Sequence, residues 1–166
     1  MSSHYAALVA RRARSWLRVL DSVEKTAARL QGRLGRATII LHGSYARGDF
    51  NLWSDIDLVI VSERFEGVRP LDRYELVSYL LEPGMEVVLL TPREAGEVLR
   101  RTGWRHALKY AVIVVDDYGL SELVERVSGV KPRTLNDLRR YVEKALEKAL
   151  AQKPGGVEDQ DWLSRC

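Results

Sequence analysis

Cysteine is almost absent from this chain of 166 residues, which has a single one, at position 166. One cysteine excludes an internal disulfide framework and a cysteine-based zinc site. Long apolar runs are also missing, because stretches such as residues 58–61 and 111–115 are far too short to cross a bilayer. The first residues contain no apolar signal-peptide core. We therefore expect a cytoplasmic protein that does not associate with a membrane.

A large net charge is lacking too, yet the charge is unevenly distributed. The formal net charge is +3, from 26 lysines and arginines against 23 acidic residues. Residues 1–36 contain eight basic and two acidic side chains, so the remainder of the chain is net acidic. Five of the basic side chains recur at helical spacing: Arg11, Arg14, Arg18, Lys25 and Arg29. This stripe indicates either contact with RNA or an acidic partner, or simply a solvated helix face.

What is present suffices for a folded domain with a helical extension, since 46% of the residues are hydrophobic. Apolar side chains between positions 9 and 30 recur at steps of three and four, which predicts a helix over residues 5–34. Thr134 is placed to cap a final helix over residues 135–152. Apolar and β-branched runs predict strands over residues 37–41, 56–61, 85–90 and 111–115.

The order of these elements predicts an α/β (α+β) fold with a small mixed β-sheet of about four strands, flanked by helices, and long amphipathic helices at both ends. We divide the chain into a basic N-terminal helix (1–36), an α/β core (37–118), C-terminal helices packed on the core (119–152) and a flexible tail (153–166).

Shorter helices are expected between the strands. Pro70 begins a predicted helix that reaches residue 82, with an inward face of Leu71, Tyr74, Val77 and Leu81. Thr91-Pro92-Arg93-Glu94 is a capping box with proline at the first helical position, so a helix begins there and is expected to end near residue 103. Further short helices are predicted over residues 104–110 and 120–127.

Two carboxylates stand at the start of the second predicted strand. Asp55 and Asp57 are two residues apart, so both side chains point to the same face. Adjacent carboxylates repel each other unless a cation or a proton lies between them. The pair therefore suits Mg²⁺ or Mn²⁺, which prefer oxygen ligands. The alternative is a pair of turn residues that cap the strand.

A Gly-Ser pair precedes these carboxylates by ten residues. Gly43 lets a phosphate approach the backbone, and Ser44 offers a hydroxyl and an amide. Arg47 is close enough in sequence to reach a triphosphate oxygen, or alternatively to pair with Asp49 or Asp55.

The pattern Gly43-Ser44-x10-Asp55-x-Asp57 resembles the signature of the DNA polymerase β-type nucleotidyltransferase superfamily. The local sequence, Gly-Ser-Tyr-Ala-Arg-Gly-Asp followed by Ser-Asp-Ile-Asp-Leu-Val-Ile, is similar to that of its minimal nucleotidyltransferase branch. The close resemblance covers residues 39–61, and a weaker likeness in element order extends to about residue 115.

The resemblance implies that three carboxylates hold two divalent ions, in a two-metal displacement of pyrophosphate. Two aspartates of one strand and one acid of a neighbouring strand form the set. By position, Asp55 and Asp57 match the aspartates, and Glu86, at the start of the strand over residues 85–90, matches the third acid. An exposed strand-end glutamate is the alternative for Glu86. Gly43 and Ser44 match the element that binds nucleotide phosphates.

The resemblance also implies a reaction, the transfer of a nucleoside monophosphate from a nucleoside triphosphate, with ATP expected, to a hydroxyl acceptor. In the minimal branch the acceptor can be a tyrosine or serine of a helical partner toxin, which would make this chain an antitoxin. Two alternatives stay open: adenylyl transfer to a small molecule such as an antibiotic, and a non-catalytic nucleotidyltransferase-like binding module. The two long amphipathic helices also leave a homodimer open.

Overall fold

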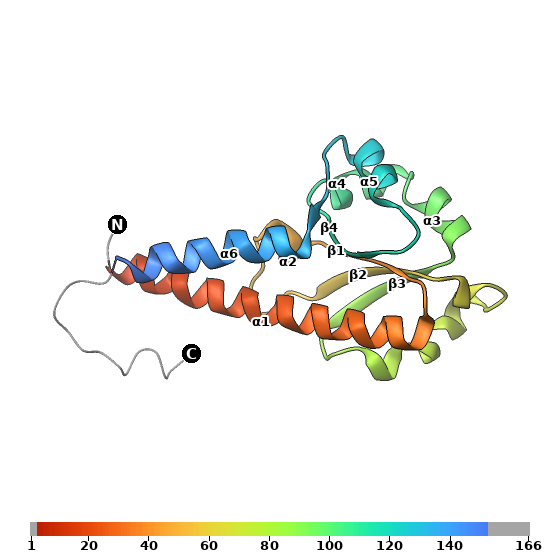
Figure 1. The fold of residues 1–166 in the computed structure, drawn as a ribbon, viewed down its shortest axis with the longest axis horizontal. Coiled ribbons are helices and arrows are strands. Elements are labelled where there is room, and N and C mark those ends of the chain that lie inside the picture. Colours follow the sequence, from red (N-terminus) through yellow and green to blue (C-terminus); the bar gives the residue numbers. More distant parts are fainter. Residues whose placement is uncertain (1–2, 153–166) are drawn as a thin grey trace.

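The core of the protein is a five-stranded mixed sheet in the order β3-β2-β1-β4-β5, seen in a computed structural model that describes residues 3–152 (Figure 1). β1 is antiparallel to β2 and β4, whereas the β2–β3 and β4–β5 pairs are parallel. The strands are β1 (Thr38–His42), β2 (Ile56–Val61), β3 (Met85–Leu90), β4 (Val112–Asp116) and β5 (Arg133–Thr134).

This sheet confirms the predicted fold class and adds one strand to it. Four of the strands occupy the predicted positions to within one residue at either end. The fifth, β5, has two residues, which is too short to produce any hydrophobic periodicity. The predicted tail over residues 153–166 lies outside the described residues.

Helices cover both faces of the sheet. The α-helices are α1 (Ser3–Leu34), α2 (Ser44–Arg47), α3 (Pro92–Val98), α4 (Thr102–Leu108), α5 (Ser121–Ser128) and α6 (Leu135–Leu150), and three short 3₁₀ helices are η1 (Glu63–Phe65), η2 (Pro70–Leu76) and η3 (Ser78–Leu80). No helix within residues 3–152 is long and apolar enough to span a bilayer.

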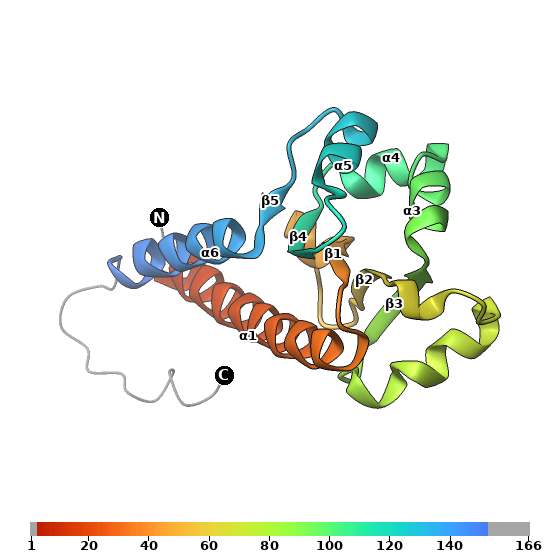
Figure 2. The ribbon, with the colours of Figure 1, turned by 45° about the vertical axis from the view of Figure 1, so that its right-hand side comes forward.

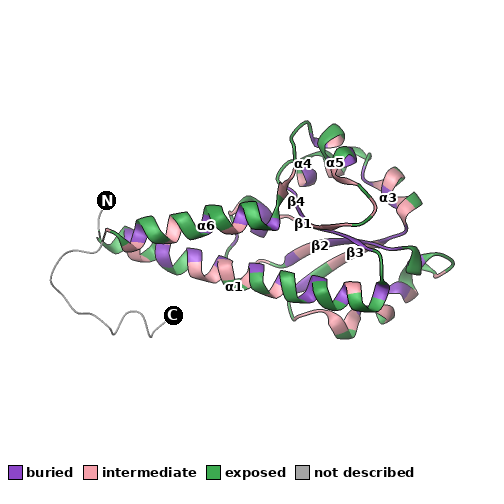
Figure 3. Cartoon of the chain, in the orientation of Figure 1, coloured by how far each residue is buried: buried purple, intermediate pink, exposed green. Residues whose placement is uncertain are grey.

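Alternate side chains of the central strands enter two separate hydrophobic clusters. Leu58 and Ile60 of β2 pack with α1 and α6, whereas Val59 and Val61 pack with α3, α4 and α5. β2 is therefore covered on both faces over most of its length, as its nearly continuous apolar sequence predicts. The purple segments of the strands in Figure 3 mark this buried layer.

Helices α1 and α6 lie side by side and antiparallel, and their far ends project beyond the sheet (Figures 1 and 2). The Trp16 and Tyr141 rings meet edge-on at 6.3 Å between centroids. The Arg139 guanidinium pairs with both Asp21 and Glu24. A capping box holds the start of α6, where the Thr134 hydroxyl accepts from the Asp137 amide at 3.1 Å, as predicted.

The segment over residues 70–82 differs from the sequence-based prediction. It forms the 3₁₀ helices η2 and η3, and the side chains of Leu71 and Tyr74 are exposed rather than inward. A 3₁₀ helix repeats every three residues. In η2 that period turns Arg73 inward, where it forms a bidentate ion pair with Glu94 at 2.6 and 2.7 Å.

The next helical segment also differs in its bounds. Its capping box is confirmed, because the Thr91 hydroxyl accepts from the Glu94 amide at 3.2 Å. The helix that begins there ends at Val98, well before residue 103, and α4 starts at Thr102.

Candidate functional site

Three polar residues lie in one row across three neighbouring strands. His42 of β1 pairs in register with Asp57 of β2, and Asp57 pairs in register with Glu86 of β3. Residues in register on adjacent strands project to the same face of a sheet. The sheet therefore brings Asp57 and Glu86 together, although 28 intervening residues separate them in the sequence.

Gly43 follows His42 and lies against Asp57, which is possible because glycine has no side chain. Its φ of 72° is in the left-handed region, and a Cβ built on it would lie 2.2 Å from the Asp57 Oδ2. Only glycine permits so close an approach of the backbone to this carboxylate. The two halves of the sequence pattern, Gly-Ser and Asp-x-Asp, are therefore in direct contact.

The half-buried Asp57 carboxylate lies in an unfavourable electrostatic environment. Its pKa is raised first by burial, then by the negative charges of Glu86 and Asp55, while the positive charge of Arg47 acts in the opposite direction. Within residues 3–152, no group donates a hydrogen bond to Asp55, Asp57 or Glu86. The repulsion among the three carboxylates is opposed at Asp57 by the positive charge of Arg47, but by no hydrogen bond from residues 3–152.

His42, at the other end of the row, is neutral at pH 7. Burial, followed by the positive charge of Arg47, lowers its pKa to about 4. Its ring packs edge-on against Trp104 of α4 at 5.2 Å between centroids. In the sequence, His42 stands next to Gly43 of the motif. Its position beside Asp57 follows from the strand register.

Ser44 and Arg47 begin and end the short helix α2, directly after Gly43. The Arg47 Nε lies 3.3 Å from the Asp49 Oδ2, so this arginine pairs with Asp49 rather than with Asp55. Its charge nevertheless influences both His42 and Asp57. Arg47 therefore supplies positive charge next to the carboxylates.

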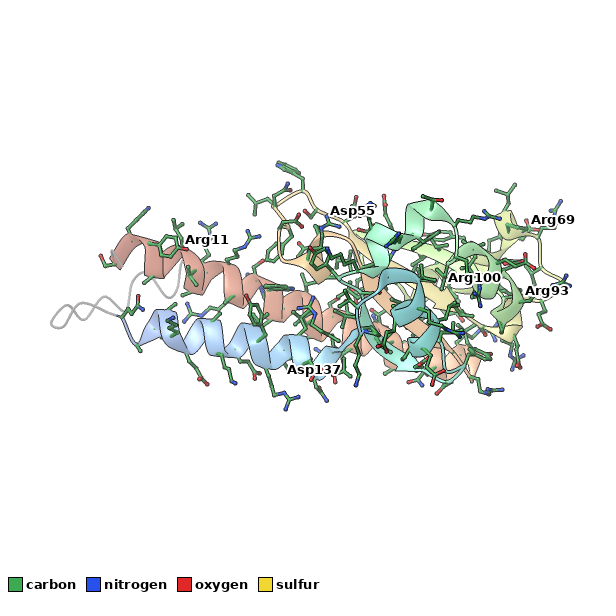
Figure 4. The ribbon with its side chains drawn as sticks, turned by 90° about the horizontal axis from the view of Figure 1, so that it is seen from above. Arg11, Asp55, Arg69, Arg93, Arg100 and Asp137 are labelled. Atoms are coloured by element: carbon green, nitrogen blue, oxygen red, sulfur yellow. The ribbon has the colours of Figure 1, made fainter. Side chains whose placement is uncertain are left out.

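The loop that carries Asp55 is anchored on α1, an arrangement that the sequence does not reveal. The Trp16 indole donates to the Tyr45 carbonyl oxygen at 2.8 Å. The Phe50 ring stacks on Tyr45 at 4.5 Å between centroids and meets Trp16 at 5.4 Å. Figure 4 shows Asp55 on this loop, on the side of the molecule where α1 rather than α6 lies.

The donor set of the site fits a hard divalent cation. Carboxylate oxygens are the ligands that Mg²⁺ and Mn²⁺ prefer, and Asp55 and Glu86 are exposed side chains that can rotate toward Asp57. As they stand, no three histidine, cysteine or acidic side chains in the described part of the chain are grouped closely enough to hold a metal ion. Cation binding would therefore require Asp55 and Glu86 to turn toward Asp57.

The fold is a mixed sheet with helices on both faces, and the candidate site lies at the ends of its central strands. A family model for the nucleotidyltransferase domain matches residues 21–150 of this sequence. The chain therefore belongs to the nucleotidyltransferase domain family, which confirms the resemblance found in the sequence.

Two solved structures are similar in part. One is a candidate nucleotidyltransferase from Sulfolobus solfataricus, at 22% identity and a TM-score of 0.46, covering 55% of this chain and 79% of the other. The second is a toxin-antitoxin with AMP-PNP, at 18% identity and a TM-score of 0.42, covering 80% of this chain and 95% of the other. No curated protein matches the chain significantly.

Proposed function

We propose that this nucleotidyltransferase is metal-dependent and transfers AMP from ATP to a hydroxyl of a partner protein. The observation that carries the proposal is the contact between the two halves of the motif. Asp57 lies against Gly43 and in register with Glu86, with Asp55 two residues away, and no hydrogen bond from residues 3–152 compensates these charges. Clusters of like charge that shift the pKa of one of their members are typical of functional sites.

Asp55, Asp57 and Glu86 are the proposed metal ligands and the catalytic carboxylates. Two Mg²⁺ or Mn²⁺ ions bound by them would stabilise the negative charge on the triphosphate and on the attacking and leaving oxygens. Asp57 is the central ligand of the three, because it lies between Glu86 of the next strand and Asp55 of its own.

Gly43, Ser44 and Arg47 are the proposed nucleotide-binding residues. Gly43 leaves its backbone open to a phosphate, and the Ser44 hydroxyl can donate to a phosphate oxygen. The Arg47 guanidinium would attract the triphosphate, because its positive charge already acts on Asp57. His42 is neutral at pH 7, so it adds no charge to the site.

A macromolecular acceptor is supported by an exposed apolar pair beside the site. The side chains of Leu52 and Trp53 are 88% and 89% exposed, and they precede Asp55 by two or three residues. Large apolar side chains that gather next to a site mark surfaces that bind other proteins. We therefore propose a serine or tyrosine of a partner protein, such as a toxin, as the acceptor.

Incubation of the protein with labelled ATP, GTP, CTP or UTP, together with the product of the adjacent gene, tests this proposal. We expect the mass of that partner to increase by one AMP in the presence of Mg²⁺ or Mn²⁺, and by nothing in the presence of EDTA. Transfer to an aminoglycoside-type small molecule instead would support the small-molecule alternative. Nucleotide binding without transfer to any acceptor would support the non-catalytic module.

A further inference from the structure

A groove of about 590 Å³ runs between the N-terminal half of α1 and the segment that joins α2 to β2. One wall is basic and belongs to α1, and the other is largely apolar. The side chains that define these walls are Arg11, Arg12 and Arg18, facing Tyr45, Phe50 and Leu52. Figure 4 shows that Arg11 lies on the side of α1 that faces away from α6. The loop that carries Asp55 lies on the same side.

Two of the arginines in this groove carry charges that the described residues do not neutralise. Arg12 is engaged, because it donates to the Gly48 carbonyl oxygen at 2.5 Å and its guanidinium lies 4.1 Å from the centroid of the Phe50 ring. Within residues 3–152, Arg11 and Arg18 form no hydrogen bond or ion pair. No acidic side chain of the same residues lines the groove. The groove therefore favours a ligand with negative charges.

The same groove also presents apolar surface. Leu8, at its outer end, is 50% exposed, and Leu52, near the candidate site, is 88% exposed. A ligand that satisfies the whole groove therefore combines acidic groups with large apolar ones.

One segment of this chain has that composition. Residues 157–163 read Val-Glu-Asp-Gln-Asp-Trp-Leu, with three acids followed by a tryptophan and a leucine. The segment lies outside the described residues. Its chemistry complements both the unneutralised arginines and the apolar wall.

The end of α6 lies beside the half of α1 that lines the groove. α6 runs antiparallel to α1, as the contacts of Tyr141 with Trp16 and of Arg139 with Asp21 show, and it ends at Leu150 near the first turns of α1. The groove extends from Leu8 to Arg18, which is about 15 Å along a helix at 1.5 Å per residue. The five residues 152–156 can span roughly 17 Å when extended.

We propose that residues 157–163 bind in this groove of their own chain, with the acidic groups facing Arg11 and Arg18 and with Trp162 on the apolar wall near Leu52. If the proposed function holds, the segment competes with the acceptor protein for the groove. The binding itself does not depend on that function.

The cysteine at position 166 provides the test, because it is the only one in the chain and accepts a nitroxide label without mutagenesis. Paramagnetic broadening of backbone amide signals in the ¹⁵N-labelled full chain reports which residues the labelled end approaches. We expect strong broadening of residues 8–18 and 45–52 at low salt, and weaker broadening at about 1 M salt, since charge screening is then nearly complete. Broadening that is absent, or is centred on another surface, overturns the proposal.

Two variants on opposite sides of the contact sharpen the test. The groove variant R11Q/R18Q and the segment variant E158Q/D159N/D161N should each reduce the broadening about fivefold or more. R93Q/R100Q is the matched control, because Figure 4 places both arginines at the far end of the molecule, and it should keep the broadening. The segment variant leaves every described residue unchanged, so its result stands even if the groove variant folds poorly.

A mixture of nitroxide-labelled ¹⁴N protein and unlabelled ¹⁵N protein separates binding within one chain from binding between copies. Broadening that persists fully in the mixture means that the segment binds a second copy, which contradicts the proposal. None of these readouts measures nucleotide transfer. A failure of the proposed function therefore remains distinguishable from a failure of this inference.

Discussion

Asp57 and Asp116 are half-buried aspartates of the same sheet, but their surroundings shift their pKa values in opposite directions. Asp116, at the end of β4, accepts hydrogen bonds from the amides of Leu120 and Ser121 at 2.7 and 3.0 Å, and from the hydroxyls of Ser121 and Thr38 at 2.6 and 3.1 Å. Burial alone would raise its pKa, but these hydrogen bonds outweigh burial and lower the pKa. Asp57 accepts no hydrogen bond from residues 3–152, and burial together with Glu86 and Asp55 raises its pKa.

The comparison teaches that fold and function make different demands on one residue type. The charge of Asp116 is used within the protein, where it accepts from the amides of Leu120 and Ser121 at the start of α5 and from the Thr38 hydroxyl of β1. Asp57 accepts no hydrogen bond from residues 3–152, which is costly for the protein alone but leaves the carboxylate available to a cation. Substitutions of the two aspartates should therefore have opposite consequences.

Asp57→Asn should produce the largest effect of all. We expect AMP transfer to fall by about 10³-fold or more, on the order of 4 kcal/mol of transition-state stabilisation, because the proposed central metal ligand is lost. The unfolding free energy of the apo protein should stay the same or rise by up to about 1 kcal/mol, since a repelled charge is removed. Transfer kinetics and urea denaturation measure the two quantities.

The charge-matched control is Asp72→Asn, which removes an exposed aspartate paired with Arg69, away from the site. This control should retain transfer. Undiminished turnover of Asp57→Asn would refute the assignment of Asp57 as a metal ligand.

Gly43→Ala should have the next largest effect. The added Cβ would lie 2.2 Å from the Asp57 Oδ2, and the φ of 72° disfavours any L side chain. Because Asp57 must move, we expect a loss of transfer of about 100-fold. Gly96→Ala is the control, since its Cβ meets no atom within 4 Å. Equal activities of the two alanine variants would contradict the close approach of Gly43 and Asp57.

Asp116→Asn should destabilise the fold without impairing the chemistry. The asparagine side chain retains one acceptor oxygen but turns an NH₂ group toward amide and hydroxyl donors, so we expect a loss of about 2–3 kcal/mol in unfolding free energy. Transfer per folded molecule should be unchanged. Asp21→Asn, which breaks an exposed ion pair with Arg139, should cost less than about 1 kcal/mol. If both variants lose the same unfolding free energy in urea denaturation, Asp116 contributes no more to stability than a surface charge, which contradicts the prediction.

The smallest effect is a dependence of stability on pH that arises from His42. Its pKa falls from 6.5 to about 4 on folding, so the unfolded chain takes up the proton first. The stability contributed by the neutral ring is complete above pH 6.5 and is lost as the pH falls toward 4. Between pH 7 and pH 5 we expect a loss of about 1–2 kcal/mol.

His42→Gln should abolish this part of the pH dependence in urea denaturation, because glutamine does not titrate. The control variant His106→Gln, at an exposed position, should leave this pH dependence unchanged. If both variants keep the same slope between pH 7 and pH 5, another group is responsible for the dependence.

Several elements could be predicted because their signals are local. The periodicity of α1, the capping boxes at Thr91 and Thr134 and the apolar sequence of β2 each lie within a short stretch of chain, and all are confirmed. The segment over residues 70–82 was predicted only in part. Val77 is buried as predicted, but Arg73 is buried too, because it pairs with the distant Glu94 and donates to the carbonyl oxygens of Val68 and Leu89.

The sequence by itself determined the chemistry of the candidate site. The carboxylates, the glycine and their spacing are properties of a short motif, and that motif indicated the nucleotidyltransferase family that the family model then confirmed. Only the tertiary structure decided which groups meet. The pairing of β1, β2 and β3 places His42, Asp57 and Glu86 in one row, and α1 supplies the arginines that face the loop before Asp55. Strand register and helix packing join residues that are far apart in the chain, and no local pattern records such contacts.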